Sequence, residues 1–202
     1  GWFSSLKNAG LLDLIHENGI EWLNVFAVDN VLQRIADPCF IGATITENRS
    51  VGAKVVCKNH PDEKVGVMCL KDNHPSIVEY YELTPELRDA VDEDGEPAYN
   101  FGVILNYLFK ESELEDICEN TLPLHIVEKK IPYIDDAGTL IKPEEPNGYK
   151  FETLILDMIQ MMDTCLPFEV ERDKEFAPIK NKTGIDSVES ARALLAKNGV
   201  TL

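Results

Sequence analysis

The chain has 202 residues, of which 44% are hydrophobic and 27% charged, a composition that excludes wholesale disorder and is typical of a globular domain. Asp and Glu number 36 against 19 Lys and Arg, so the formal net charge is −17. A chain this acidic is repelled by the phosphates of nucleic acids and anionic membranes, and its composition therefore disfavours both as partners. A small phosphorylated ligand remains compatible with this charge where a few lysines converge.

Membrane and secretion signals are missing from the sequence. No apolar run reaches the roughly 18–20 residues of a membrane helix, and the first residues do not form a secretory signal. The five cysteines are odd in number and widely spaced, without a CxxC pair. Such cysteine usage is typical of a reducing compartment, so we expect a cytoplasmic protein without structural zinc.

The first part of the chain predicts a helix, a buried strand and a series of short β segments. Apolar residues recur at helical spacing over 6–15, and Asn18-Gly19 is a strong stop signal. Residues 22–28 form an apolar run of β-formers that ends at Asp29, which predicts a buried strand with a carboxylate at its end. Further short strands are expected at 40–46, 53–58, 65–70 and 77–83.

The remainder alternates helices and strands. We expect, in chain order, a helix opening at Thr84-Pro85, a strand at 101–109, a helix at 112–118 behind a capping box, a hairpin at 131–141, a helix at 151–162, a strand at 166–170 and a capped helix at 186–198. The close spacing of the β segments favours hairpins. The sequence therefore predicts an α/β fold whose mixed sheet is flanked by helices.

Asp29 is the first candidate site residue. The usual phosphate-loop, dinucleotide, zinc-protease and nucleophile-elbow motifs are not found in this sequence. Ligands of open α/β sheets bind outside the carboxyl ends of strands, where a carboxylate is suited to Mg²⁺. The competing interpretation is that Asp29 caps a helix over residues 30–36.

A second candidate is the segment Glu79-Tyr80-Tyr81-Glu82, which interrupts an otherwise buried strand. Strand alternation would place Glu79 and Tyr81 on one face and Tyr80 and Glu82 on the other. An inward carboxylate must be paired or must bind a ligand, and sugar hydroxyls are suitable partners. Solvated charges on an edge strand are the alternative.

The third candidate is a set of lysines in or beside predicted loops, where they could bind phosphate or simply be solvated: Lys129, Lys130, Lys142, Lys150 and Lys180.

Short segments spread over about residues 1–196 carry a family resemblance when taken together. They are Val28-Asp29-Asn30-Val31-Leu32 through Ala36-Asp37-Pro38, Gly52-Ala53-Lys54-Val55-Val56, Val65-Gly66-Val67, Val78-Glu79-Tyr80-Tyr81-Glu82, Lys129-Lys130-Ile131-Pro132-Tyr133, Lys142-Pro143 with Pro146-Asn147-Gly148, Phe176-Ala177-Pro178-Ile179-Lys180-Asn181 and residues 190–195. In this order they resemble the UDP-N-acetylglucosamine pyrophosphorylases of the UDP-sugar pyrophosphorylase superfamily.

This resemblance implies a reaction and a fold. UTP and a sugar 1-phosphate give a UDP-sugar and pyrophosphate, in a nucleotide-diphospho-sugar transferase (Rossmann-like) fold. The sugar-phosphate oxygen attacks the α-phosphorus in line, which requires positioning and positive charge near the phosphates. By the same resemblance, Asp29 lies near the nucleotide and Mg²⁺, Lys150 contacts UTP, and Lys180 contacts the phosphates as a catalytic residue.

The resemblance also implies a sugar subsite. Glu79 and Tyr80 match the sugar-contacting pair, and Gly66 leaves room beside the sugar. Val103 stands where the family usually has a sugar-contacting asparagine, although Asn100 remains nearby in sequence as a substrate-binding candidate. This departure leaves open which sugar 1-phosphate is used.

The family's glycine-rich UTP loop would lie upstream of Gly1. We therefore expect residues 1–175 to be the carboxyl-terminal half of the catalytic domain, residues 176–202 to begin a loop-and-helix segment, and the chain alone to be inactive. Its oligomeric state is open. The alternative hypothesis is a non-catalytic domain that binds a sugar or nucleotide sugar, or that mediates assembly.

Overall fold

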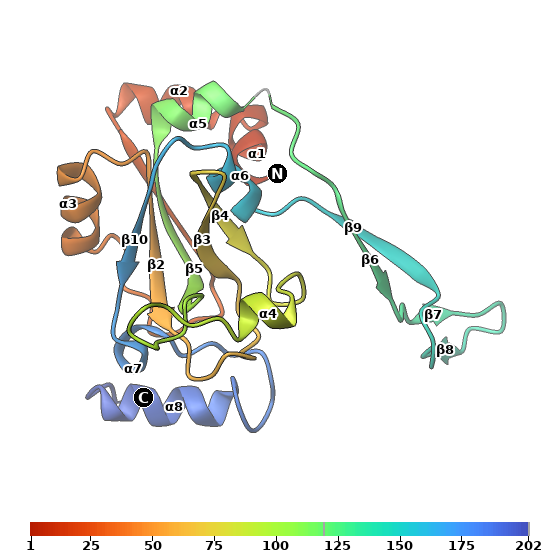
Figure 1. Cartoon of the computed structure of the whole chain (residues 1–202). Coiled ribbons are helices and arrows are strands. Elements are labelled where there is room, and N and C mark those ends of the chain that lie inside the picture. The colour runs from red at the N-terminus through yellow and green to blue at the C-terminus, as the bar shows by residue number, and fades with distance from the viewer. Residues whose placement is uncertain (119, 202) are drawn as a thin grey trace.

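The computed structural model describes residues 1–118 and 120–201, and it shows a mixed sheet with helices around it and a thin arm that projects from the body (Figure 1). The strands are β1 (Trp22–Phe26), β2 (Val51–Cys57), β3 (Val67–Lys71), β4 (His74–Val78), β5 (Phe101–Lys110), β6 (His125–Lys129), β7 (Tyr133–Ile134), β8 (Leu140–Ile141), β9 (Gly148–Glu152) and β10 (Cys165–Glu169). The helices are α1 (Trp2–Asn8), α2 (Leu11–Glu17), α3 (Pro38–Thr46), α4 (Pro85–Arg88), α5 (Glu111–Ile117), α6 (Leu156–Gln160), α7 (Arg172–Glu175) and α8 (Val188–Lys197).

The main sheet has six strands in the order β10-β2-β5-β3-β4, with β1 also paired to β5. Strands β10 and β2 run parallel, whereas β5 is antiparallel to β2, β3 and β1, and β3 and β4 form an antiparallel hairpin. The expected mixed sheet flanked by helices is confirmed.

Strand β5 changes its partner along one edge, and this change opens a gap in the sheet. It pairs with β3 at Gly102 and with β1 from Asn106 onward. In the intervening stretch, the Val103 N–H donates to the Gly66 carbonyl (2.9 Å), and the Ala27 N–H donates to the Leu105 carbonyl (2.9 Å). The register opposite β2 also shifts here, and Leu105 has a φ of 50°. Backbone in the left-handed region is costly for leucine and persists only where the surrounding structure imposes it.

Alternate residues of β2 serve the two faces of the sheet. Val51, Ala53 and Val55 are fully buried in the main core, which side chains from α1, α5 and α6 complete. On the opposite face, Gly52 lies against Phe40 and Thr44 of α3. Each large apolar side chain buried in this way contributes about 1.5–3 kcal/mol. Among the described residues, every helix is too short or too polar to cross a membrane.

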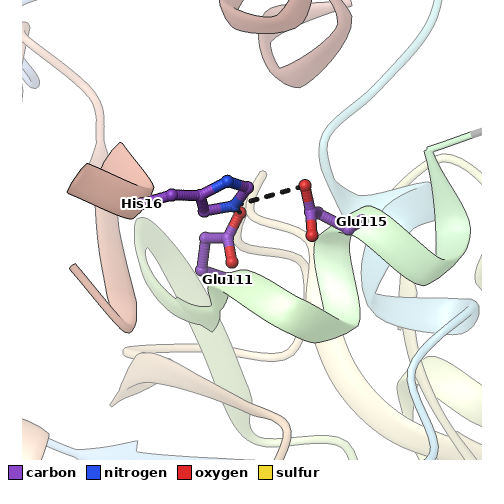
Figure 2. Close-up of side chains that lie close together, drawn as sticks. All are labelled: His16, Glu111 and Glu115. Atoms are coloured by element: carbon purple, nitrogen blue, oxygen red, sulfur yellow. Dashed lines mark hydrogen bonds and ion pairs between the residues drawn. The ribbon is translucent and has the colours of Figure 1, made fainter. Parts of the chain in front are cut away.

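The amino-terminal helix is divided, in contrast to the single helix expected. Gly10 has a φ of 67°, which separates α1 from α2, while Gly19 (φ 62°) ends α2 as predicted. The imidazole Nε2 of His16, on α2, lies 3.1 Å from Glu111 Oε1 and 3.4 Å from Glu115 Oε1 of α5 (Figure 2). These contacts of one imidazole with two carboxylates join the two helices at the end of the sheet where β1 begins.

The strand predicted at 40–46 is wrong, because this segment is helix α3. Asp37 caps the helix and Pro38 occupies its first turn, a combination that favours helix over the β-branched residues that follow. The cap expected at the start of the helix at 186–198 is confirmed at α8, where Ser187 and Ser190 form a capping box. The one predicted at Ser112 is not formed, since α5 begins at Glu111 without a side-chain cap.

Three other strand and helix assignments need correction. β1 is half-buried throughout rather than buried, because it pairs only with β5. β4 ends at Val78, and the next residues form a turn closed by the Glu82 N–H on the Glu79 carbonyl (2.8 Å), so the predicted alternation of faces is wrong. Phe151 belongs to β9, paired with Ile126 of β6, and the helix expected from 151 is limited to α6.

The arm consists of the β6–β9 pair and the small β7–β8 hairpin, which extend away from the body in Figure 1. The predicted hairpin around Asp136 is confirmed, and Gly138 supplies its left-handed residue (φ 79°). Ile126, Tyr149 and Phe151 are exposed on the arm.

The packing of α3 on β2 predicts that Gly52→Ala is destabilising. A Cβ at this position would lie 2.5 Å from Thr44 Oγ1 and 2.7 Å from Phe40 Cε2, in a fully buried contact. We expect the free energy of unfolding to fall by about 1–3 kcal/mol, as in other overpacked cores. The matched control is Gly42→Ala within α3, where nothing lies within 4 Å of the new methyl. That change should stabilise the protein by about 0.5–1 kcal/mol. Equal responses of both variants to urea would contradict the packing described.

Candidate functional site

A cavity of about 280 Å³ occupies the gap between β1 and β3. Its walls come from the segments that follow β1, precede β3, follow β4 and precede α6, from the bulged part of β5, and from the segment after α7. The lining residues are Ala27, Asp29, Asn30, Lys64, Val65, Gly66, Glu79, Val103, Ile104, Leu105, Tyr107, Leu154, Ile155, Leu156, Phe176, Pro178 and Lys180. Four of the predicted site residues, Asp29, Gly66, Glu79 and Lys180, therefore share one cavity.

Two loops that are far apart in sequence pair along their backbones to bring Asp29 and Lys180 together. The Ile179 N–H donates to the Asp29 carbonyl (2.9 Å), and the Val31 N–H donates to the Ala177 carbonyl (3.3 Å). Within the described part of the chain, the Asp29 carboxylate and the Lys180 ammonium make no side-chain hydrogen bond or ion pair. An acid and a base that line one cavity without pairing remain free to bind a ligand.

Asn30 fastens these loops from inside. Its side chain is 3% exposed, its Nδ2 donates to the Glu175 carbonyl (2.7 Å), and its Oδ1 accepts the Ala177 N–H (2.8 Å). A buried amide is stable only when its polar atoms are satisfied, and here both are. The amide therefore sets the distance between the segment after β1 and the segment after α7.

A buried ionic network lies beneath these loops. Lys54 of β2 is fully buried, and its Nζ lies 2.8 Å from Asp37 Oδ2 and 2.5 Å from Glu175 Oε2. Arg34, at the solvent side, lies 3.6 Å from Asp37 and 3.5 Å from Glu175. Removing one partner from such a pair costs about 3–5 kcal/mol, because a buried charge is left alone.

Lys54 lowers the pKa of Asp37. Burial acts to raise the pKa of Asp37, but the hydrogen bond and charge of Lys54, with smaller contributions from the Cys39 amide and Arg34, hold that pKa below its ordinary value. Asp37 therefore stabilises the fold above the ordinary carboxyl range, and this stabilisation is lost as the pH falls through its lowered pKa.

Glu79 is half-buried in the cavity wall, and its carboxylate has no hydrogen-bond donor among the described residues. Burial, followed by the charge of Glu82, raises the pKa of Glu79, although His125 opposes the shift. Gly66 provides the space beside it, since a Cβ there would lie 3.1 Å from Ile77 Cγ2 and 3.3 Å from Val103 Cγ2. The arrangement leaves a carboxylate that can accept ligand hydroxyls.

Three predicted site residues lie outside this cavity. Tyr80 packs edge-on against Tyr81, with ring centroids 5.2 Å apart. Asn100 accepts the Lys58 N–H through Oδ1 (2.9 Å). Lys150 lies on strand β9 of the arm, where its Nζ is 2.5 Å from Glu152.

Sequence reasoning missed two lysines near the cavity. Lys64 lines it directly and is exposed. It precedes Val65-Gly66-Val67, so its position beside that segment was an available signal. Lys54 stands in the middle of an apolar strand, and burial of a lysine among valines signals a nearby anion.

Among the described residues, the Asp29 carboxylate and one cluster of side chains have donors suited to a metal ion. The Asp29 carboxylate offers the oxygen ligands that Mg²⁺ prefers. Residues 30–36 form turns rather than a helix and the Asp29 side chain caps nothing, so the capping interpretation is wrong. The other group, His16, Glu111 and Glu115, lies at the opposite end of β1, and its ion pairs account for its geometry.

The structure is thus an α/β domain with a cavity lined by Asp29, Glu79 and Lys180, whose charged groups have no internal partners among the described residues. The family model for UTP–glucose-1-phosphate uridylyltransferase matches residues 1–201, essentially the whole chain. The chain therefore belongs to this family, and the family predicted from its motifs is confirmed.

Curated relatives carry related names. The chain is 40% identical to UDP-N-acetylhexosamine pyrophosphorylase-like protein 1 of Mus musculus, over 98% of the chain and 40% of that protein. It is 37% identical to the UDP-N-acetylglucosamine pyrophosphorylase of Saccharomyces cerevisiae, over 100% of the chain and 44% of that protein. The chain thus spans about two fifths of the length of these relatives.

Solved structures share the fold. A crystal structure of an Entamoeba histolytica protein superposes with a TM-score of 0.88 at 34% identity, covering 97% of this chain and 49% of that one. The uridine diphosphate N-acetylglucosamine pyrophosphorylase from Trypanosoma brucei, solved in complex with an inhibitor, gives a TM-score of 0.80 at 28% identity, covering 93% and 37%.

The raised pKa of Glu79 predicts a pH-dependent effect of Glu79→Gln. A carboxyl whose pKa is higher in the folded protein than in the unfolded chain destabilises the fold once the pH rises above its ordinary range. We expect Glu79→Gln to unfold at a higher urea concentration than wild type at pH 7, and we expect the difference to vanish below about pH 4.

The control is Glu93→Gln, which removes the same charge from an exposed turn. It corrects for the lower net charge of the variant. If Glu79→Gln and Glu93→Gln shift the urea midpoint equally, both at pH 7 and below about pH 4, the environment assigned to Glu79 is wrong.

Proposed function

We propose that this chain forms the sugar- and phosphate-binding part of a uridylyltransferase, which makes UDP-N-acetylglucosamine or a related UDP-sugar, with pyrophosphate, from UTP and a sugar 1-phosphate. The observation that carries the proposal is the set of unpaired charges around one cavity: Asp29, Glu79 and Lys180. A purely structural cavity would be apolar or would pair its charges internally.

The chemistry requires position and charge rather than covalent help. An in-line attack on the α-phosphorus crowds negative charge onto phosphate oxygens, and a fixed cation at that point stabilises the transition state. Lys180 is the catalytic cation in this proposal, with Lys64 as a second cation at the cavity wall. Glu79 would accept sugar hydroxyls and so orient the attacking sugar phosphate.

Asp29 would hold Mg²⁺ in this arrangement. Its carboxylate lines the cavity without a partner among the described residues, so its oxygens are available to a hard cation. When bound, the ion would supply charge neutralisation to the phosphates. Asp29 itself holds the loop geometry, because its carbonyl accepts the Ile179 N–H.

N-acetylglucosamine 1-phosphate is our first choice of sugar phosphate. It is supported by the names of the relatives from Saccharomyces cerevisiae and Trypanosoma brucei. Val103 lines the cavity and its side chain has no hydrogen-bonding group, so in this proposal the sugar is recognised by Glu79 and by the shape of the cavity. Tyr80, Asn100 and Lys150 stay as substrate-binding proposals, with Lys150 requiring movement of the arm or a ligand that extends to it.

A cytoplasmic location is also proposed. Cys39 and Cys57 are exposed thiols that form no disulfide. Exposed thiols persist in reducing compartments and tend to be oxidised elsewhere.

The second candidate function is a non-catalytic domain that binds a nucleotide sugar. The same cavity supports it, because Asp29, Glu79 and Lys180 could bind a nucleotide sugar without any transfer reaction. Binding of UDP-N-acetylglucosamine without pyrophosphate release would favour this candidate.

The test is pyrophosphate release from UTP and N-acetylglucosamine 1-phosphate by the longest protein that contains this chain. We expect activity in wild type, and we expect Lys180→Ala to lower kcat by about 10²-fold or more, as loss of a phosphate-stabilising group does.

Lys182→Ala is the matched control, because Lys182 is exposed two residues away and does not line the cavity. Its kcat should stay within about twofold of wild type. Equal kcat values in all three proteins would remove Lys180 from the mechanism, and a wild type that releases no pyrophosphate would reject the proposed reaction.

A further inference from the structure

We propose that Lys54 is a positioning residue: its buried ammonium ties the Asp29 loop and the Lys180 loop to the sheet and thereby fixes the distance between their functional groups. The proposal rests on the proposed function, since it assigns a role relative to Lys180. Lys54 does not line the cavity, so it acts through other residues.

The tie begins on a rigid support. Lys54 lies in the middle of β2, a strand paired on both sides by β10 and β5. Its side chain is fully buried, with the ring of Phe40 5.5 Å from Nζ. An ammonium in such a place has a single low-energy arrangement, because moving it away from its carboxylates would leave charges unpaired.

The first of the two connections made by Lys54 leads through Glu175 to the Lys180 loop. Glu175, the last residue of α7, receives Lys54 on its carboxylate (2.5 Å) and Asn30 on its carbonyl (2.7 Å). The chain then continues through Ala177, whose N–H is held by Asn30, to Ile179, whose N–H is held by the Asp29 carbonyl. Lys180 is the next residue, so the contacts of Glu175, Ala177 and Ile179 fix the position of its backbone.

The second connection made by Lys54 leads through Asp37 to the Asp29 loop. Asp37 receives Lys54 on Oδ2 (2.8 Å) and caps α3 through Oδ1, which accepts the Cys39 N–H. The preceding residue is also fixed, because the Ala36 N–H donates to Asn24 Oδ1 of β1 (2.9 Å). The segment from Asp29 to Asp37 is therefore anchored at β1 and at Lys54. One ammonium thus anchors both loops that meet at the cavity.

A purely stabilising role for Lys54 is the alternative, and it makes a different prediction. If only stability matters, restoring charge balance restores activity. If position matters, it does not. The double variant Lys54→Met, Glu175→Gln removes the tie but buries no lone charge at Glu175, and Asp37 keeps Arg34 as a partner.

The experiment measures kcat, KM and the urea midpoint for this double variant in the longest protein that contains the chain. We expect a midpoint near that of wild type, an unchanged KM within a few-fold, and a kcat lowered by about 10²-fold, the effect of a displacement near 1 Å at a reacting centre. Adding Lys180→Ala to the double variant should lower kcat little further, because groups that act as a unit are not additive.

Glu111→Gln is the matched control. The Glu111 side chain is 8% exposed and the Glu175 side chain 6%, and Glu111 is bonded to His16 as Figure 2 shows. Glu111 lies beside the start of β1, since its N–H donates to the Glu21 carbonyl (2.8 Å), whereas Asp29 follows the end of that strand. The Glu111→Gln variant should lose stability and keep its kcat. A double variant with wild-type kcat, a fully additive effect of Lys180→Ala, or an equal loss of kcat in Glu111→Gln would each overturn the positioning role.

Failure of the proposed function gives a separate signature, namely a wild type without transfer. The positioning role is then decided by hydrogen exchange at the Ile179 amide. Faster exchange in the double variant than in Glu111→Gln supports the tie, and equal exchange overturns it.

Discussion

One buried lysine between two carboxylates is the constraint on which the rest of this structure depends. Lys54 contacts Asp37 and Glu175, which stand at the ends of two loops separated by more than a hundred residues of chain. Burying the charges of Lys54, Asp37 and Glu175 is costly unless all three are paired and hydrogen-bonded. Because they are paired, the loops have one arrangement, and the apolar packing of Phe40 and Phe168 around them completes it.

As a result, the cavity has charged side chains that are not paired within the described part of the protein and can bind a ligand. The internal network satisfies Asp37 and Glu175, whereas Asp29, Glu79 and Lys180 face the cavity without internal partners among the described residues. A second contribution comes from β5, whose bulge and left-handed Leu105 separate β1 from β3. Strain and unpaired polar groups therefore gather in the same place, which is typical of functional sites.

Much of this was accessible from sequence, for identifiable reasons. Short apolar segments predicted strands at 53–58, 101–109 and 166–170, where β2, β5 and β10 lie, and a capped helix was predicted at 186–198, where α8 lies. Two segments were assigned wrongly. Residues 40–46 have β-forming composition, but the Asp37 cap and Pro38 start a helix there, which packs on Gly52. Phe151 pairs with Ile126 instead of joining α6, a tertiary contact that the sequence does not show. At the site, Asp29 was suggested by its place after a strand, while Lys54 and Asn30 act through contacts that only the folded chain reveals.

The central claim is that the buried tie presents Asp29, Glu79 and Lys180 to a single ligand. A crystal structure of the protein with bound UDP-N-acetylglucosamine tests this most directly. We expect the diphosphate between Asp29 and Lys180, with the sugar hydroxyls at Glu79 and the Lys54 ion pairs intact. A ligand bound outside this cavity, or a diphosphate that contacts neither Asp29 nor Lys180, would show that the tie does not serve this ligand.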